Sequence, residues 1–206
     1  GLLALAKAFP GAPLRIDPNG NWTVPTSLKV VEQLRGVLEY YEDPAPGLEG
    51  MAAVAAQHPE LERVGGGEMR WLGFKLYDAA LWARARGEAA VGEAHALSIR
   101  YARAISSERL VSVSLDEMRR LGVADEARLT RWGEALAAAL PSVEAGDTLA
   151  ALHRPGEGAR FWHQGEPSGE IRDPDLARAF FAIWLDPRTR EPELRAQLLG
   201  LADGGR

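Results

Sequence analysis

The stretch GGGEMRWLGFKLYDAALW, residues 65–82, sets three consecutive glycines before a run in which apolar and polar residues mix with aromatic ones. Residues 68–77 predict a long β-strand that the glycines introduce, and residues 79–83 either continue this strand or pair with it. Alternate residues of an ideal strand lie on opposite faces, with Met69, Trp71, Gly73, Lys75 and Tyr77 on one and Arg70, Leu72, Phe74 and Leu76 on the other. Both faces are mainly apolar, so alternation alone does not decide which one looks into a cleft.

The chain after this stretch predicts short strands and amphipathic helices. Residues 97–101 predict a strand, residues 147–153 and 159–163 a hairpin, and residues 170–172 are a candidate third strand. Helices are expected at 107–121, 125–140, 175–185 and 193–201. In the second of these, an apolar stripe recurs at helical spacing in Leu129, Trp132, Leu136 and Leu140.

The first 54 residues have a different pattern and contain six of the 13 prolines within residues 1–46. A helix at 2–9, a strand at 13–16, a helix at 25–35 and a strand at 37–41 are expected, which is typical of β/α units in a parallel sheet. Residues 50–57 predict a short helix or a linker. We therefore expect two units, a partial β/α segment over 1–54 and a second domain over 56–206.

Two carboxylates follow the predicted parallel strands, Asp17 before Pro-Asn-Gly and Glu42 before Asp-Pro. In a β/α barrel such residues meet at the carboxyl ends of the strands, where paired oxygen ligands suit Mg²⁺. The alternative is that Asp17 is only a turn residue.

Composition excludes several classes of function. The net charge of −5 argues against a nucleic-acid partner, and the absence of cysteine excludes disulfides, thiolate nucleophiles and thiolate metal centres. The four histidines form no metal-binding pair, and we expect no membrane span because the longest apolar stretch, residues 176–185, is half the length needed. Residues 1–6 resemble part of a leader but lack its basic start, so the compartment is left open.

Residues 57–201 resemble the chalcone isomerase-like family. The resemblance is carried by GGG at 65–67, RWLGFKLYDAALW at 70–82, Gly146-Asp147, PGEG at 155–158, Gly165, Gly169, AFFAIWL at 179–185, Leu194-Arg195 and LLG at 198–200. It implies an α+β fold in which an antiparallel sheet packs against a layer of helices, with a ligand cleft between them. It also favours an exported, periplasmic protein.

The same resemblance implies a function. Non-catalytic relatives of chalcone isomerase bind fatty acids through an arginine and a tyrosine, for which Tyr77 and either Arg63 or Arg70 are the candidates here. The catalytic threonine position falls on Lys75, which is the fourth ligand-binding candidate. No tyrosine occurs between residues 102 and 206 to replace the one that the enzyme carries on a helix. We therefore expect no catalysis and no cofactor.

Residues 1–54 resemble two consecutive β/α units of glucarate dehydratase in the enolase superfamily, through LALAKAFP at 3–10, RIDPNGNW at 15–22 and LEYYEDP at 38–44. In that family the matching acids are metal ligands, which maps onto Asp17 and Glu42. The rest of the dehydratase machinery is missing, so Mg²⁺ is expected only if this segment were functional.

Three hypotheses for the function follow. The first is a domain that binds an apolar or carboxylate-bearing small molecule, such as a fatty acid, without catalysis. The second is an enzyme, either a chalcone isomerase with a relocated catalytic set or a remnant of a Mg²⁺-dependent sugar-acid dehydratase. The third is a structural or partner-binding domain with no ligand.

Overall fold

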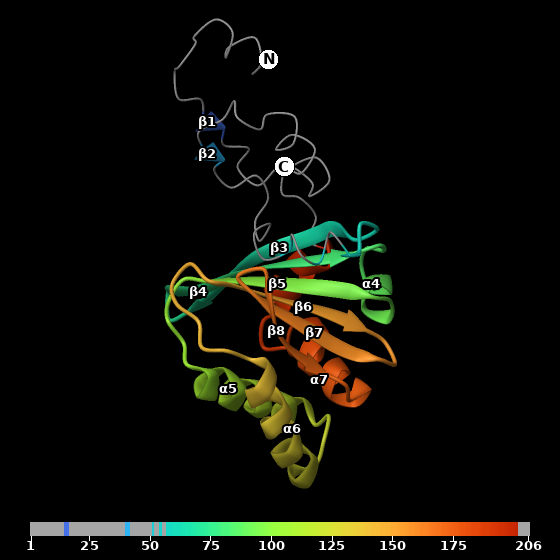
Figure 1. The fold of residues 1–206 in the computed structure, drawn as a ribbon. Helices are drawn as coiled ribbons and strands as arrows, with labels where there is room; N and C mark the ends of the chain where they lie inside the picture. The colour runs from blue at the N-terminus through green and yellow to red at the C-terminus, as the bar shows by residue number, and fades with distance from the viewer. Residues whose placement is uncertain (1–14, 17–39, 42–50, 52–53, 55–56, 202–206) are drawn as a thin grey trace, which may run out of the picture.

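A six-stranded antiparallel sheet forms the centre of the computed structural model, which describes residues 15–16, 40–41, 51, 54 and 57–201. Each strand pairs with the next one along the chain, so the sheet is a simple meander (Figure 1). In sheet order its strands are β3 (Glu62–Trp71), β4 (Phe74–Ala83), β5 (His95–Tyr101), β6 (Thr148–Arg154), β7 (Gly158–His163) and β8 (Glu166–Ile171).

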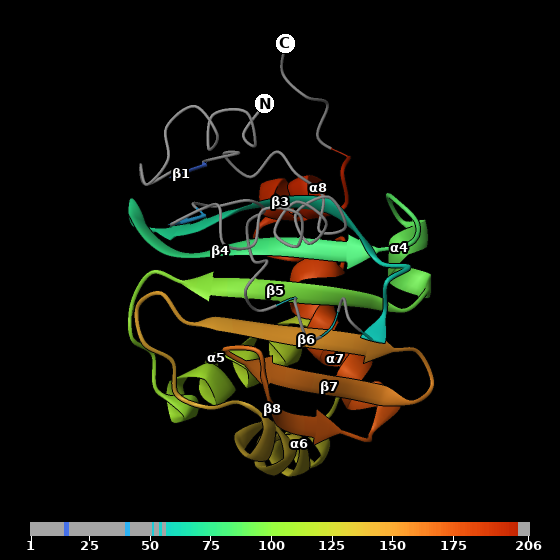
Figure 2. The ribbon, with the colours of Figure 1, turned by 45° about the horizontal axis from the view of Figure 1, so that its top comes forward.

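The helices cover one face of this sheet, here called the inner face. Figure 1 shows α5, α6 and α7 below the strands, Figure 2 shows α7 and α8 behind them, and the short α4 lies at one end of the sheet. They are α4 (Ala89–Gly92), α5 (Ser107–Leu121), α6 (Glu126–Ala139), α7 (Pro174–Leu185) and α8 (Pro192–Leu198). The predicted α+β fold, with an antiparallel sheet against a layer of helices, is confirmed.

Local capping explains why α5 and α6 begin where the sequence predicts. The side chain of Ser106 accepts a hydrogen bond from the backbone N–H of Arg109, and Asp125 does the same for Arg128. Gly122, in the left-handed conformation with φ 67°, ends α5. The predicted stripe of α6 is buried along its whole length.

The expected strand over residues 68–77 is wrong, because the chain reverses within it. Leu72 and Gly73 have φ of 49° and 83° and form a two-residue turn, with Trp71 opposite Phe74. Positive φ at both central residues is the requirement of a type I′ hairpin turn, whose sequence is usually Asn-Gly or Asp-Gly. Leucine rarely adopts this conformation, so the sequence did not predict a turn here.

The three glycines lie inside β3 rather than before it, and two of them let α8 lie directly on the strand. A Cβ atom at Gly65 would fall 1.9 Å from the carbonyl oxygen of Gln197, and one at Gly67 would fall 1.8 Å from Gln197 Oε1. A side chain at Gly65 would therefore push α8 off the sheet, whereas one at Gly67 would displace the side chain of Gln197.

The main core lies between the inner face and the helices, and a smaller one lies on the outer face. The outer cluster contains Leu61, Trp82, Ala96, Ala150, Leu152 and Trp162 together with Met51 and Val54, which are 1% and 0% exposed. Residues 51, 54 and 57 are helical, in agreement with the helix expected at 50–57. Both faces of the sheet are thus apolar, which is why alternation did not distinguish them.

Register shifts in the sheet are confined to its two outermost strand pairs. The β3–β4 pair is irregular at Arg63/Gly65 and at Met69/Arg70, and the β7–β8 pair is irregular at Phe161/Trp162. The three inner pairs have a continuous register.

In the N-terminal unit, β1 (Arg15–Ile16) and β2 (Tyr40–Tyr41) pair in parallel, with Ile16 opposite Tyr41. This agrees with the parallel strands expected there. The helices expected at 2–9 and 25–35, and the candidate ligands Asp17 and Glu42, lie outside the described residues.

The boundary between 1–54 and 56–206 stays a prediction, and the outer cluster provides its test. We expect the fragment 50–206 to unfold cooperatively and the fragment 55–206 to be less stable by about 3 kcal/mol or more, because it lacks two buried side chains. Urea denaturation of both fragments measures the difference. Equal stabilities would mean that Met51 and Val54 do not support the sheet.

Candidate ligand-binding site

A cavity of about 910 Å³ opens between the inner face of the sheet and helices α5, α7 and α8. Its apolar wall comes from all of these elements and consists of Met69, Trp71, Leu76, Tyr77, Ile99, Tyr101, Ile105, Leu110, Val113, Leu140, Leu149, Phe180, Ile183, Trp184 and Leu194. This volume and lining are typical of pockets that bind small organic molecules.

Two of the polar side chains that line the cavity are tyrosines. Trp184 Nε1 donates a hydrogen bond of 3.0 Å to the hydroxyl of Tyr77, whose ring packs edge-on against Tyr101 at 6.1 Å. Burial raises the pKa of Tyr77 to about 12, assisted by the nearby carboxylates of Glu191 and Glu117, and burial also raises the pKa of Tyr101. Both hydroxyls therefore stay protonated at neutral pH and can donate hydrogen bonds, but they are poor bases.

The charged residues of the cavity divide into two groups along α5. Arg109 lies in the first turn of the helix, and Glu117 lies eight residues later, about 12 Å farther along the axis. Glu117 pairs with Arg190, whose Nε is 2.9 Å from its carboxylate. Among the described residues, Arg109 and the neighbouring rim residue Arg103 have no acidic partner. One end of the cavity is thus cationic, and the other carries Arg190 together with the carboxylates of Glu117 and Glu191.

Of the four residues predicted to bind a ligand, the structure places only Tyr77 on the cavity wall. Arg70 donates to Glu68 Oε1 at 2.5 Å, and Lys75 Nζ lies 2.8 Å from Asp78 Oδ1. Both belong to an exposed ion-pair group on the side of the hairpin away from Met69 and Tyr77. Leu76 is the extra residue at the β4 irregularity, so Lys75 and Tyr77 do not share a face as alternation implied.

Arg63 is also outside the cavity lining. Its guanidinium lies over Gly66, and its Nε is buried without a hydrogen-bond partner in the described part of the chain. Burial lowers the pKa of this guanidinium. The ligand-binding roles of Arg63, Arg70 and Lys75 remain predictions, but these residues do not converge with Tyr77.

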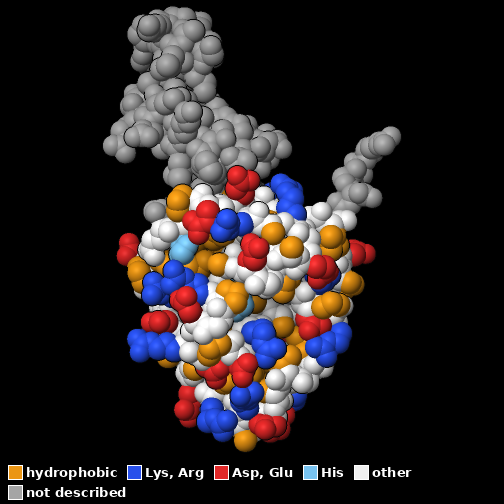
Figure 3. Space-filling view, turned by 90° about the vertical axis from the view of Figure 1, so that its right-hand side faces the viewer, with side chains coloured by type: hydrophobic (Ala, Val, Ile, Leu, Met, Phe, Trp, Pro, Cys, Tyr) orange, Lys and Arg blue, Asp and Glu red, His pale blue; other side chains and the backbone are white. Residues whose placement is uncertain are grey.

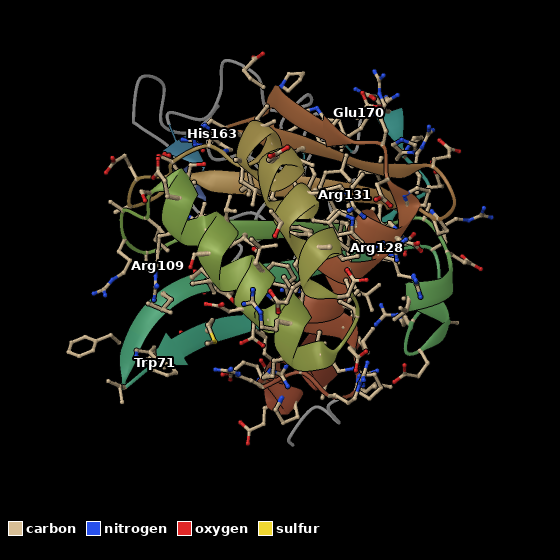
Figure 4. All side chains as sticks on the ribbon, turned by 90° about the horizontal axis from the view of Figure 1, so that it is seen from below. Trp71, Arg109, Arg128, Arg131, His163 and Glu170 are labelled. Atoms are coloured by element: carbon tan, nitrogen blue, oxygen red, sulfur yellow. The ribbon has the colours of Figure 1, made fainter. Side chains whose placement is uncertain are left out.

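Sequence reasoning missed Arg103 and Arg109, although Arg109 carries a signal. A cation in the first turn of a helix opposes the helix dipole, and the third helical position behind a serine cap is usually taken by Glu or Gln. An arginine there is therefore unexpected on local grounds, and its side chain lies at the cavity rim. Figure 4 shows Arg109 on the same side of the molecule as Trp71, which also lines the cavity.

A second cavity of about 310 Å³ lies at the α4 end of the sheet and contains two buried histidines. His95 and His153 are paired across β5 and β6, and their rings lie 4.8 Å apart against Phe181. His95 Nδ1 is 2.8 Å from the carbonyl oxygen of Glu93, so this nitrogen carries the proton of a neutral ring. Burial lowers the pKa of His153 to about 4 and also lowers the pKa of His95.

The part of the chain that the structure describes contains no group of three or more His, Asp or Glu side chains arranged to hold a metal ion. Asp17 and Glu42 lie outside it, so the metal site stays a prediction. No helix among the described residues is long and apolar enough to cross a membrane.

Residues 47–200 match the sequence model of the chalcone isomerase-like family, which is most of the chain. The chain belongs to the chalcone isomerase-like family. Among solved structures, this fold is shared with a fatty-acid binding protein of Arabidopsis thaliana, with a TM-score of 0.51. The alignment covers 69% of this chain and 88% of that protein at 11% identity, so the likeness concerns the fold alone.

The N-terminal resemblance is also confirmed. Residues 2–71 match the enolase C-terminal domain-like family, overlapping the start of the chalcone isomerase-like match. A stretch of 54 residues is 67% identical to a probable glucarate dehydratase of Streptomyces coelicolor. It covers 26% of this chain but only 12% of that enzyme.

The buried histidines predict a loss of stability in mild acid. The folded-state pKa of His153 is below its unfolded value of about 6.5, so the unfolded chain binds its proton first as the pH falls. Its stabilising contribution is complete above pH 6.5 and decreases toward pH 4, with a loss on the order of 2 kcal/mol by pH 5. Denaturant unfolding of the wild type and of His153→Leu from pH 7 to 5 measures this, and the same slope in both would contradict it.

Proposed function

We propose that this chalcone isomerase-like domain binds a fatty-acid-like molecule without catalysing a reaction. The observation that carries the proposal is the large apolar cavity, with two protonated tyrosines in its wall and, at one end, two arginines that have no acidic partner among the described residues. An apolar chain with one anionic end is the ligand chemistry that this arrangement fits. The name of the Arabidopsis neighbour, a fatty-acid binding protein, supports the same proposal.

The apolar wall supplies most of the binding free energy. A tail of roughly 12–16 carbons gains about 10–13 kcal/mol on burial at about 0.8 kcal/mol per methylene. Association and ordering of the chain cost about 4–15 kcal/mol, so micromolar affinity is expected. The apolar tail of the ligand therefore determines its affinity, and the charges at the two ends of the cavity determine its orientation.

The carboxylate belongs at the Arg103 and Arg109 end of the cavity. At the other end Glu117 already occupies Arg190, and the carboxylates of Glu117 and Glu191 lie close enough to Tyr77 to raise its pKa. A second anion there would meet repulsion, whereas at Arg103 and Arg109 it meets cations that no described acidic residue neutralises. We therefore place the tail against Tyr77 and Trp184.

The isomerase alternative lacks support from the cavity. Lys75, at the position of the catalytic threonine, is paired with Asp78 outside the cavity. No described helix presents a tyrosine to the cavity, because both cavity tyrosines lie on strands. We expect no detectable conversion of chalcone to flavanone, and its appearance in an absorbance assay would overturn the non-catalytic proposal.

Replacing the two rim arginines tests where the carboxylate binds. Arg103→Gln/Arg109→Gln should weaken dodecanoic acid roughly tenfold, as expected for two exposed ion pairs, and leave 1-dodecanol nearly unchanged. Tyr77→Phe should change both affinities by similar factors, because its hydroxyl lies at the other end. Isothermal titration calorimetry measures the affinities of both ligands for the wild type and for each variant.

Arg131→Gln is the matched control, because Arg131 is an exposed arginine on α6 that does not line the cavity (Figure 4). A loss of acid binding in Tyr77→Phe alone would move the carboxylate to Tyr77. Absence of saturable binding of either ligand to the wild type would reject the proposed function.

A further inference from the structure

The β3–β4 hairpin ends in an exposed apolar tip, made of Trp71, Leu72 and Phe74. Their exposed fractions are 56%, 83% and 65%, and they account for three of the five large hydrophobic residues that are most exposed in the described part of the chain. The opposite end of the molecule, seen in Figure 3, has its hydrophobic side chains interspersed with charges of both signs. The tip is therefore a concentrated apolar surface, of the kind that marks an interaction site.

Leu72 contributes to this surface although its backbone conformation is energetically unfavourable for leucine. It occupies a turn position with φ 49°, where asparagine, aspartate or glycine is favoured, and its side chain is almost completely exposed. Neither turn geometry nor packing within the domain explains a leucine at this position. Its presence is explained if a partner outside the chain buries the leucine side chain.

The tip lies at the mouth of the large cavity. Trp71 belongs both to the tip and to the cavity wall, and Val113 on α5, another exposed residue, lines the cavity as well. The guanidinium of Arg103 lies 6.0 Å from the centre of the Phe74 ring, so a rim arginine contacts the tip directly. A molecule that engages the tip therefore faces the cationic end of the cavity.

The charges beside the tip favour an anionic partner. Glu68 and Asp78 neutralise Arg70 and Lys75, whereas Arg103 and Arg109 remain without acidic partners among the described residues. Exposed Trp, Leu and Phe flanked by arginine are the side chains that enter the interface of a bilayer with anionic headgroups.

We propose that the hairpin tip docks on an anionic lipid bilayer and holds the cavity mouth against it. The inference rests on the proposed function, since a fatty acid is the ligand that a bilayer stores. An acid leaving the bilayer would enter tail first, and its carboxylate would stay at Arg103 and Arg109 by the membrane surface.

Vesicle binding by two leucine variants tests the proposal. Leu72→Asn removes the apolar side chain and creates the preferred Asn-Gly turn, so the variant should be at least as stable as the wild type. It should bind vesicles of phosphatidylcholine with 30% phosphatidylglycerol at least roughly tenfold more weakly in co-sedimentation. Leu201→Asn, which replaces another exposed leucine that follows α8, should bind like the wild type.

Calorimetry with dodecanoic acid in the absence of vesicles separates the two proposals. Leu72 does not line the cavity, so Leu72→Asn should keep the affinity for the acid. Acid binding by the wild type without vesicle binding would overturn the docking proposal and leave the proposed function intact. Vesicle binding without acid binding would reject the proposed function alone.

Two further results would overturn docking on a bilayer. Equal vesicle binding by Leu72→Asn and the wild type would show that the tip is not the contact. Concentration-dependent dimers in sedimentation, absent in Leu72→Asn and accompanied by no vesicle binding, would show that a second copy covers the tip.

Discussion

The direct contact of α8 with β3 is the constraint on which the rest of the domain depends. It requires a strand position without a side chain, and Gly65 provides it because even a methyl group there would overlap the backbone carbonyl of Gln197. With α8 on the first strand, Leu194 reaches the cavity and α8 packs in the same layer as α7. The glycine triplet thus serves close packing between a helix and a sheet, rather than flexibility or phosphate binding.

A cavity remains under the helices because different parts of the layer pack differently on the sheet. Near α4, the rings of His95 and His153 pack against Phe181 and leave the smaller cavity of about 310 Å³. Toward the hairpin tip, α5 contributes residues from Arg109 to Glu117 to the cavity wall, where they face Tyr77 and Tyr101 on the strands. The same helix thus brings Arg109, which has no acidic partner in the described part of the chain, to one end of the cavity, and Glu117, which is paired with Arg190, to the other.

The helices were the most predictable part of the fold, since capping residues and the stripe through Leu129 and Leu136 act locally. The β3–β4 hairpin was not predictable, because Leu72-Gly73 does not resemble a turn and because both faces of the sheet are apolar. For the same reasons, strand alternation wrongly placed Lys75 on the same face as Tyr77. Arg103 and Arg109 are distant in sequence from Tyr77. The pairing of β5 with β4 brings Arg103 to the cavity, and the packing of α5 on the sheet brings Arg109 there.

The irregular pairing at both borders of the sheet has a consequence for solubility during folding. An open antiparallel sheet has two strand edges that can template the addition of further chains, as in amyloid. Here β3 carries glycines and two register shifts, and β8 carries Pro167, which has no backbone N–H to donate, beside another shift. The inner strands pair regularly, but both of their edges are already occupied by neighbouring strands. The irregular edge strands are poor templates for fibril growth.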